Sequence, residues 1–157
     1  LTRTLGEAIA RKINAKMISA IDTAVTTATG TTITAATVQA LLGSVKGERI
    51  AMLCNRKTLY TQLLPLQDNS KNALVRFEGT YSSARVYGVD VLVDDNVADS
   101  TIFCGDMDKL VAAIGEDISV RQAYDINTNS YKFLGVAMFD TAVGIASAFA
   151  KLAPAGG

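Results

Sequence analysis

The sequence predicts an α+β fold, because a long amphipathic helix opens the chain and a series of strand-like segments closes it. Its 157 residues suit one domain, or two small lobes that share a core. Hydrophobic residues make up 49% of the sequence and charged residues only 19%, below the usual share of roughly a quarter. We therefore expect some apolar residues to contact partner chains and the others to form the hydrophobic core of the subunit.

The clearest element is a helix over residues 4–28. Thr4 followed by Glu7 matches a capping box, and Glu7 with Arg11 has the spacing of a stabilising ion pair. Gly30 is the predicted stop after the helix. Apolar residues recur at every fourth position: Leu5, Ile9, Ile13, Met17 and Ile21.

The middle of the chain predicts two shorter helices around one buried strand. Thr34–Val45 has helical spacing of apolar residues, and Ile50–Cys54 is a continuous apolar run typical of a strand buried on both faces. Asn55 then has the position of an N-cap for a helix over Arg56–Leu64. Residues 67–83 are polar and predict a long surface loop or an irregular hairpin.

The last third is rich in strand-like segments. Asp106 is expected to cap a short helix that contains Leu110, Val111 and Ile114. Residues 153–157 are expected to form a frayed tail. The predicted turns are Asp94–Asn96, Asp125–Ser130 and Asp140–Thr141. The predicted strands are Val86–Val93, Thr101–Cys104, Ile118–Arg121, Tyr131–Phe139 and Val143–Phe149.

Charge and cysteine content argue against several classes of protein. The net charge is zero, whereas a dedicated nucleic-acid-binding protein usually has a basic face. Cys54 and Cys104 lie in apolar runs without a CxxC pair, so they are expected to be buried free thiols in a reducing compartment. The sequence has no apolar run of about 18 residues and no visible signal peptide, so we expect no membrane partner.

No catalytic or cofactor-binding residue is predicted. Histidine is absent, which removes the usual general base and the commonest metal ligand. An acidic run could bind a hard cation, but its spacing matches no calcium loop, and a polar turn followed by a helix cap is the preferred interpretation. Its members are Asp94, Asp95, Asp99, Asp106 and Asp108.

Other patterns with possible chemistry have simpler interpretations. The segment Gly43–Gly47 is a helix terminus and not a phosphate loop, since it follows a helix and lacks the Lys-Ser/Thr end. Cys54 has no neighbouring base and is expected to be inert. Lys12 and Lys16 are expected to be ordinary solvated positions. A mixed basic and aromatic set favours contact with a protein over stacking on nucleic acid: Phe77, Tyr81, Tyr87, Arg76 and Arg85.

The order of elements resembles the second half of a tailed-phage major capsid protein with the Hong Kong 97 fold. That family has a long spine helix, a short helix, a strand ending in asparagine and a further helix. The matching segments here are Leu5–Ala28, Thr34–Val45, Ile50–Asn55 and Arg56–Leu64. Three short segments follow in the family's order: Leu66–Asp68, Gly88–Val91 and Gly105–Met107. Asp90 departs from the family, which commonly has proline there.

The resemblance implies a spine helix packed on mixed and antiparallel sheets, in two lobes. Residues 1–30 and 117–140 would form a peripheral lobe, and residues 31–116 and 141–152 an axial lobe. In the family an N-terminal arm and an extended loop precede the spine helix, and nothing in this sequence corresponds to them. We therefore expect the chain to be the C-terminal core of a longer subunit.

The function that the resemblance implies is that of a structural, non-enzymatic subunit of an icosahedral phage or prophage shell. Its partners would be copies of itself in pentamers and hexamers of the full-length protein, with a scaffold or maturation protease as possible others. Packaged DNA would be contacted non-specifically at most. The protein would be made in the bacterial cytoplasm and located in the virion.

Some relatives cross-link subunits through a Lys–Asn isopeptide bond. The apolar Phe133 stands near the asparagine position, so we expect no such bond here. Asp140 falls near the acidic helper, although a turn residue is the simpler interpretation. Two alternatives stay open: an encapsulin-like compartment shell, and a small α+β enzyme or ligand-binding domain that uses Asp94, Asp95 and Asp106.

Overall fold

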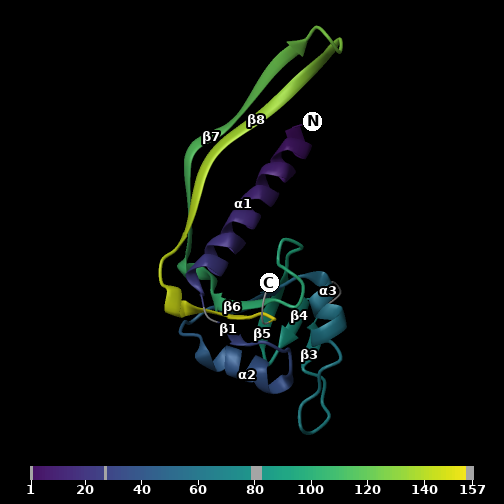
Figure 1. Ribbon diagram of the computed structural model, residues 1–157, viewed down its shortest axis with the longest axis vertical. Coiled ribbons are helices and arrows are strands. Elements are labelled where there is room, and N and C mark those ends of the chain that lie inside the picture. Colours follow the sequence, from purple (N-terminus) through teal and green to yellow (C-terminus); the bar gives the residue numbers. More distant parts are fainter. Residues whose placement is uncertain (1, 27, 79–82, 155–157) are drawn as a thin grey trace.

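A computed structural model describes residues 2–26, 28–78 and 83–154 of the chain. The molecule is elongated (Figure 1), with a sheet and short helices at one end. A long helix and a two-stranded hairpin rise from that end side by side, and the tip of the hairpin projects past the start of the helix. This is the mixed α+β architecture that the sequence predicts.

The sheet at the compact end has seven strands in the order β1-β9-β6-β2-β5-β4-β3. The pairs β1/β9 and β2/β5 are parallel and the other neighbours are antiparallel, so the sheet is mixed. The bounds are β1 Ala28–Gly30, β2 Ile50–Cys54, β3 Val75–Glu78, β4 Ser83–Val86, β5 Val89–Val93, β6 Ile102–Asp106 and β9 Phe149–Leu152.

The strand β2 at the centre of this sheet has the predicted bounds. The segment predicted as one strand over Val86–Val93 is instead two strands, β4 and β5, joined by a tight turn. Tyr87 and Gly88 have φ angles of 52° and 81° in that turn. Two successive left-handed residues are typical of a type I′ hairpin turn, which reverses the chain within two residues.

One face of the sheet is covered by α2 (Ala35–Ser44) and by α3 (Arg56–Thr58), which continues into a π-helical turn, η1 (Leu59–Leu63). Both starts are capped, and the sequence predicts the second cap, at Asn55. Thr34 accepts the N–H of Thr37 in a capping box, and the Asn55 side chain accepts the N–H of Thr58. The fully buried side chains on this side include Val38, Leu41, Met52, Cys54, Leu63, Ile102 and Cys104.

The other face of the sheet is covered by the second half of α1 (Thr2–Ala24). Ile18, Ile21 and Val25 pack there against Leu53 and Phe103. Leu53 alternates with Met52 and Cys54 along β2, so successive residues of one strand serve two different cores. The central strands are therefore buried on both faces, as the apolar run at residues 50–54 predicts.

The remaining sheet consists of β7 (Leu110–Asp125) and β8 (Ser130–Val143), paired antiparallel along most of their length. The short 3₁₀ turns η2 (Met107–Lys109) and η3 (Ala146–Ala148) connect this hairpin to β6 and β9. The segment of α1 from Leu5 to Lys16 lies on β8. There the Thr141 hydroxyl donates to the Lys16 carbonyl at 3.2 Å, and Gly135 faces Leu5 and Ile9.

Several predicted elements of the last third are wrong. Asp106 does cap a turn, accepting the N–H of Asp108, but only one 3₁₀ turn follows. Leu110, Val111 and Ile114 belong to β7, because their spacing also fits a strand and pairing with residues 139–143 favours it. The predicted turn Asp140–Thr141 lies inside β8. The predicted strand Val143–Phe149 is replaced by η3 and β9.

Both predicted ends of the first helix also change. The helix already includes Thr2, so Thr4 is not its cap, and Glu7 pairs with Arg3 at 3.0 Å instead of Arg11. The helix ends at Ala24, and Gly30 lies in β1. Residues 28–30 pair with β9, a contact between distant segments that helical spacing alone cannot indicate.

The assignment of residues to peripheral and axial lobes stays a prediction. Part of the expected tail is anchored, since the Ala153 N–H donates to the Gly30 carbonyl at 3.2 Å. Residues 155–157 lie outside the described residues, so the predicted fraying also stays a prediction.

Truncation of the central core should destabilise the fold. Met52 is fully buried between β5 and β6, so Met52→Ala is expected to lower the free energy of unfolding by about 2–5 kcal/mol in urea titrations. Leu92→Ala on the neighbouring strand is the control, because Leu92 is 46% exposed and its loss should cost about 1 kcal/mol or less. Equal losses for the two variants would contradict the assigned core.

Candidate interaction surface

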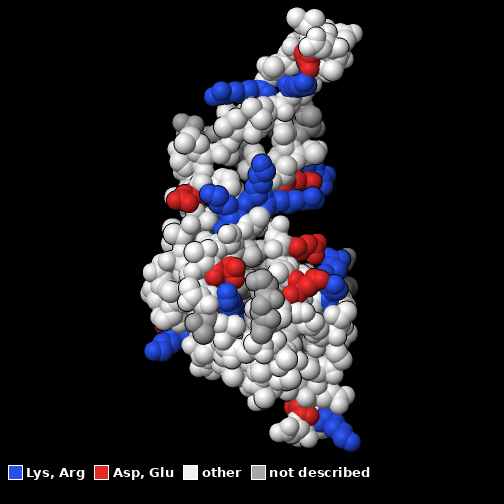
Figure 2. Space-filling view, viewed as in Figure 1, with Lys and Arg blue, Asp and Glu red and all other residues white. Residues whose placement is uncertain are grey.

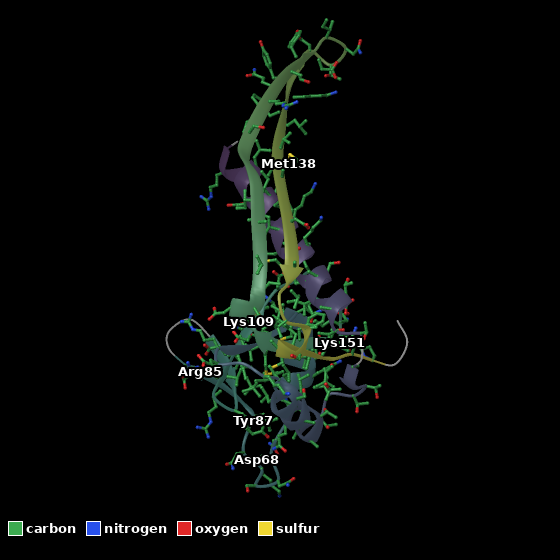
Figure 3. The ribbon with its side chains drawn as sticks, turned by 90° about the vertical axis from the view of Figure 1, so that its left-hand side faces the viewer. Asp68, Arg85, Tyr87, Lys109, Met138 and Lys151 are labelled. Carbon is green, nitrogen blue, oxygen red and sulfur yellow. The ribbon has the colours of Figure 1, made fainter. Side chains whose placement is uncertain are left out.

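The exposed large apolar side chains gather on the hairpin. Leu134, Met138 and Ile114 are 60%, 57% and 67% exposed, values that are unusual for residues of strands in a closed core. Met138 lies far along the hairpin from Lys109 at its base (Figure 3). The full set among the described residues of β7, β8 and their turn is Val111, Ile114, Val120, Tyr124, Ile126, Tyr131, Phe133, Leu134 and Met138.

The hairpin has two faces, of which one packs against α1 and the other does not. Side chains of β8 alternate, so Phe133, Gly135 and Phe139 face α1 while Leu134 and Met138 point to the opposite side, here called the outer face. Nothing in the described part of the chain covers the outer face. It continues onto β7 through the cross-strand pairs Leu134–Arg121 and Ala142–Val111.

The face toward α1 is itself only half covered. The helix packs along β8, whereas Val120 and Ile114 of β7, opposite Gly135 and Phe139, are largely exposed. An apolar groove runs between the helix and β8, lined by Leu5, Ile9, Phe133 and neighbouring residues. The helix α1 is therefore too narrow to cover the whole face of the hairpin against which it packs.

The edges of the hairpin are open as well. Among the described residues the sheet contains only β7 and β8, so each strand has one edge whose backbone groups have no partner strand there. A two-stranded sheet alone is marginally stable in water, and a long apolar edge strand is a template for pairing. Register shifts in β7 between Ile114 and Ser119 coincide with the bend of the hairpin in Figure 1.

Local contacts nonetheless order the tip of the hairpin. The rings of Tyr124 and Tyr131 have centroids 5.1 Å apart, and Lys132 pairs with Asp125. Lys132 and a backbone N–H hold the pKa of Asp125 below its usual range. The tip of the hairpin is therefore held by side-chain contacts and presents two aromatic side chains.

The structure separates the aspartates that were considered as a cation site. Asp94 follows the end of β5 beside Cys54, whereas Asp106 pairs with Ile50 at the other end of β2. Five residues of strand span roughly 13 Å, too far for one ion to bridge. Among the described residues, no group of three or more Cys, Asp or Glu side chains could hold a metal ion.

Four of the five aspartates in this run have a structural partner, and Asp95 lies in the turn after β5. Asp94 accepts the N–H of Asn96 at 2.9 Å in the turn, and buried Asp106 accepts backbone N–H groups of Glu48 and Asp108. Asp108 lies 3.5 Å from Arg49. These are the turn and cap roles that the sequence favours.

Asp99 has a role that sequence reasoning missed. It accepts from Asn55 Nδ2 at 2.7 Å and pairs with Lys57 at 2.5 Å, and the hydrogen bond from Lys57 holds its pKa below the usual range. Asn55 also caps α3 and donates to the Val97 carbonyl, so it ties that helix to the turn after β5. More than 40 residues separate these partners, so no local pattern could predict the link.

The other candidates take structural positions. The Tyr87 hydroxyl accepts from Gln39 at 2.8 Å, and Arg85 is engaged by Asp90 and Glu78. Tyr81 lies outside the described residues. Gly47 packs against Asp106, where a Cβ would meet the Asp106 Cβ at 2.5 Å, so the Gly43–Gly47 segment is a packed helix terminus. Phe133 and Asp140 lie on opposite faces of β8.

The two cysteines are free and buried, as expected. Burial raises the pKa of Cys54 to about 11 and that of Cys104 to about 12, because the thiolate is poorly solvated inside the core. A nucleophilic role would require the opposite shift. In the described part of the chain, no helix has the length and apolar character needed to cross a membrane.

The comparisons with known proteins agree with this architecture. A family model described as phage capsid protein matches residues 1–152. No curated protein sequence matches the chain.

Three solved structures are similar in fold. A chain of Mycobacterium phage Che8 has a TM-score of 0.61 at 12% identity and 96% coverage of this chain. A virus-like particle from Pyrococcus furiosus has a TM-score of 0.60 at 12% identity and 94% coverage of this chain. The capsid of an empty GTA particle has a TM-score of 0.59 at 19% identity and 76% coverage of this chain. At such identities the likeness shows the fold alone, which is of the Hong Kong 97 type, as predicted. This chain spans only 61%, 64% and 44% of those chains.

The buried thiols should make stability depend on pH. Their folded pKa values lie above the ordinary value of 9.0, so their contribution is complete below pH 9 and is lost as pH rises toward 11–12. Between these limits the free energy of unfolding should fall by about 1.4 kcal/mol per pH unit for each thiol. Urea titrations at pH 9.5 and pH 10.5 measure this slope. A Cys54→Ala/Cys104→Ala variant that keeps the same slope would contradict the prediction.

Proposed function

We propose that this chain, which belongs to the phage capsid protein family, is a wall-forming subunit that assembles with copies of itself into a closed shell. The observation that carries the proposal is the hairpin of β7 and β8. No other described part of the chain covers its outer face, its two edges or the part of its inner face formed by β7. A subunit with so much exposed apolar surface needs neighbours to bury it.

The geometry favours repeated contacts of one kind. An extended hairpin with one rigid helix beside it reaches away from the compact end and can lie across an adjacent subunit (Figure 1). Stable contacts between chains bury about 1,000 Å² or more, and a long apolar ribbon offers such an area without folding changes. Copies of one chain related by rotation would then close into rings and shells.

The proposal includes a structural role without catalysis. The sequence has no histidine, both thiols have raised pKa values, and the aspartates serve turns, caps and ion pairs. The compact end would meet other copies around five- and six-fold axes as the axial lobe, and the hairpin with α1 would form the peripheral lobe. The finished location would be the virion, after synthesis in the bacterial cytoplasm.

Charged substitutions on the outer face should prevent assembly. In the complete gene product, Leu134→Glu/Met138→Glu places two carboxylates where a neighbour would bury apolar side chains. We expect loss of closed particles by electron microscopy and sedimentation velocity, with unchanged circular dichroism, because both side chains are exposed in the folded subunit.

The matched control is Leu92→Glu/Ile145→Glu, which changes two apolar residues of similar exposure outside the hairpin. Normal particle yield from the hairpin variant, or equal loss from the control, would contradict the role of this surface. Particle contents separate the two kinds of shell: nuclease-protected DNA fits a phage capsid, and an enclosed enzyme fits the encapsulin-like alternative. Absence of any shell from the unmodified protein would refute both.

A further inference from the structure

The strand β3 forms an open edge of the seven-stranded sheet. It is last in the strand order, and among the described residues only β4 pairs with it. Arg76, Phe77 and Glu78 are exposed, whereas Val75 belongs to the core that α2 and α3 cover. The strand lies at the compact end, remote from the tip of the hairpin (Figure 1). An open edge of this kind can accept a strand from another chain.

The pattern of strand pairing shows which backbone groups face this edge. The two-residue turn at Tyr87–Gly88 is closed by the pair Val86–Val89, which is the hydrogen-bonded pair in a hairpin of this type. Hydrogen-bonded positions alternate along a strand, so Arg85 directs its backbone groups toward β3 and not toward β5. Its opposite residue Arg76 therefore bonds to β4. The N–H and C=O of Phe77, one residue further along β3, point to the open edge.

The side chains of the edge leave one charge without a counterpart. Arg76 and Glu78 point to one face of the sheet and Phe77 to the other. Over the compact end in Figure 2, red and blue side chains mostly lie side by side. Arg76 departs from this rule, because the residue directly opposite it on β4 is Arg85, a like charge. Arg85 is engaged by Glu78 at 3.2 Å and Asp90 at 2.6 Å, whereas Arg76 forms no ion pair among the described residues.

Asp68 borders the same surface hollow as Arg76 but does not neutralise it. Its carboxylate accepts the Ser70 N–H at 2.8 Å, and it accepts both the backbone N–H and the side-chain amide of Asn72. The hydrogen bonds from Asn72 hold the pKa of Asp68 below its usual range, so the carboxylate is already stabilised within its own loop. The charge of Arg76 is therefore left for a carboxylate outside the subunit.

A second copy of β3 supplies that carboxylate when the two edges pair antiparallel. If Phe77 lies opposite Phe77 of the partner subunit, Arg76 lies opposite Glu78 of the partner subunit, and the reverse pair forms by symmetry. The register shifted one way puts Arg76 opposite its own counterpart, and the register shifted the other way does the same with Glu78. Like charges directly opposite each other destabilise a pair of strands. Of these three registers, only the first satisfies both the outward backbone groups of Phe77 and the charges.

We propose that β3 is a docking edge for β3 of a second copy, with the two strands antiparallel about a two-fold axis at Phe77. Each copy then contributes the same Arg76 and Glu78, which is the isologous arrangement of a two-fold contact. Phe77, which is 43% exposed, gains an aromatic cross-strand neighbour on the opposite face. An edge this short buries well under the ~1,000 Å² of a stable interface, so the pair is weak and depends on concentration. The contact is additional to that of the hairpin and does not depend on the proposed shell function.

Disulfide trapping detects a weak pair and reports its register. In the complete gene product, Phe77→Cys places two thiols opposite each other with Cα atoms about 5.5 Å apart, within the range of a disulfide. With oxidised glutathione, we expect covalent dimers on non-reducing gels at least about tenfold faster than for Leu92→Cys, because the strand pair raises the local thiol concentration. Leu92, on β5, is the matched control since it is 46% exposed. The natural Cys54 and Cys104 are buried. Equal rates for the two variants, or faster linking by Arg76→Cys, would overturn the proposal.

Charge changes in the Phe77→Cys protein test the two ion pairs. Adding Arg76→Glu puts a carboxylate opposite Glu78 of the partner subunit, and trapping should slow about fivefold or more. The new carboxylate faces Arg85 within its own chain, so the fold should not weaken. Adding Glu78→Lys instead should slow trapping as well, because a cation then lies opposite Arg76. An equal mixture of these two proteins restores opposite charges and should give mixed dimers at nearly the original rate. A mixture that links no faster than its components would contradict the register.

The outcome is separable from that of the shell function, because trapping is measured on protein that does not sediment as particles. Trapped dimers of a protein that forms no shells under any condition would support the β3 contact and refute the shell function. Closed shells of the unmodified protein, without trapping at residue 77, would refute the β3 contact and leave the shell function intact.

Discussion

The constraint on which the structure depends is that a two-stranded sheet cannot bury its own apolar side chains. Sheets become independently stable when further strands or a packed helix cover a face. Here α1 supplies that cover for β8 only, and Ile114 and Val120 of β7 stay open beside it. The hairpin is ordered enough to project from the subunit, yet it has surface that only another chain can bury. This incompleteness is the physical basis for association.

The long helix resolves a second problem, which is how a projecting hairpin keeps a fixed direction. Its C-terminal end is part of the compact core, where Ile18 and Ile21 pack on Phe103. The turns before that end pack on β8, at Gly135 and Thr141. One continuous helix thus belongs to both parts of the molecule. Because a helix resists bending within a few turns, the direction of the hairpin follows from the packing of Ile18 and Ile21.

Local signals explain which predictions from the sequence succeed. The Ile50–Cys54 strand, the Thr34 region and the Asn55 cap are encoded by adjacent residues, and they appear as predicted. The errors lie where pairing between distant segments decides the structure. The sequence predicts a helix that contains Leu110 and Ile114, which belong to β7, and a turn at Asp140, which lies inside β8. The interaction surface was predictable only in outline. Leu134 and Met138 occupy alternating apolar positions that look like core, and only the excess of apolar residues over the whole chain indicated that some of them face partners.

The exposed apolar surface of the hairpin is suited to permanent contacts between copies of the chain. Leu134 and Met138 are exposed on the outer face, which points away from α1, so a neighbouring subunit can bury them without displacing the helix. Burial of apolar surface is favourable at any salt concentration, because it does not depend on the attraction of opposite charges. The net charge of zero adds no long-range repulsion between identical chains, so it does not oppose this contact.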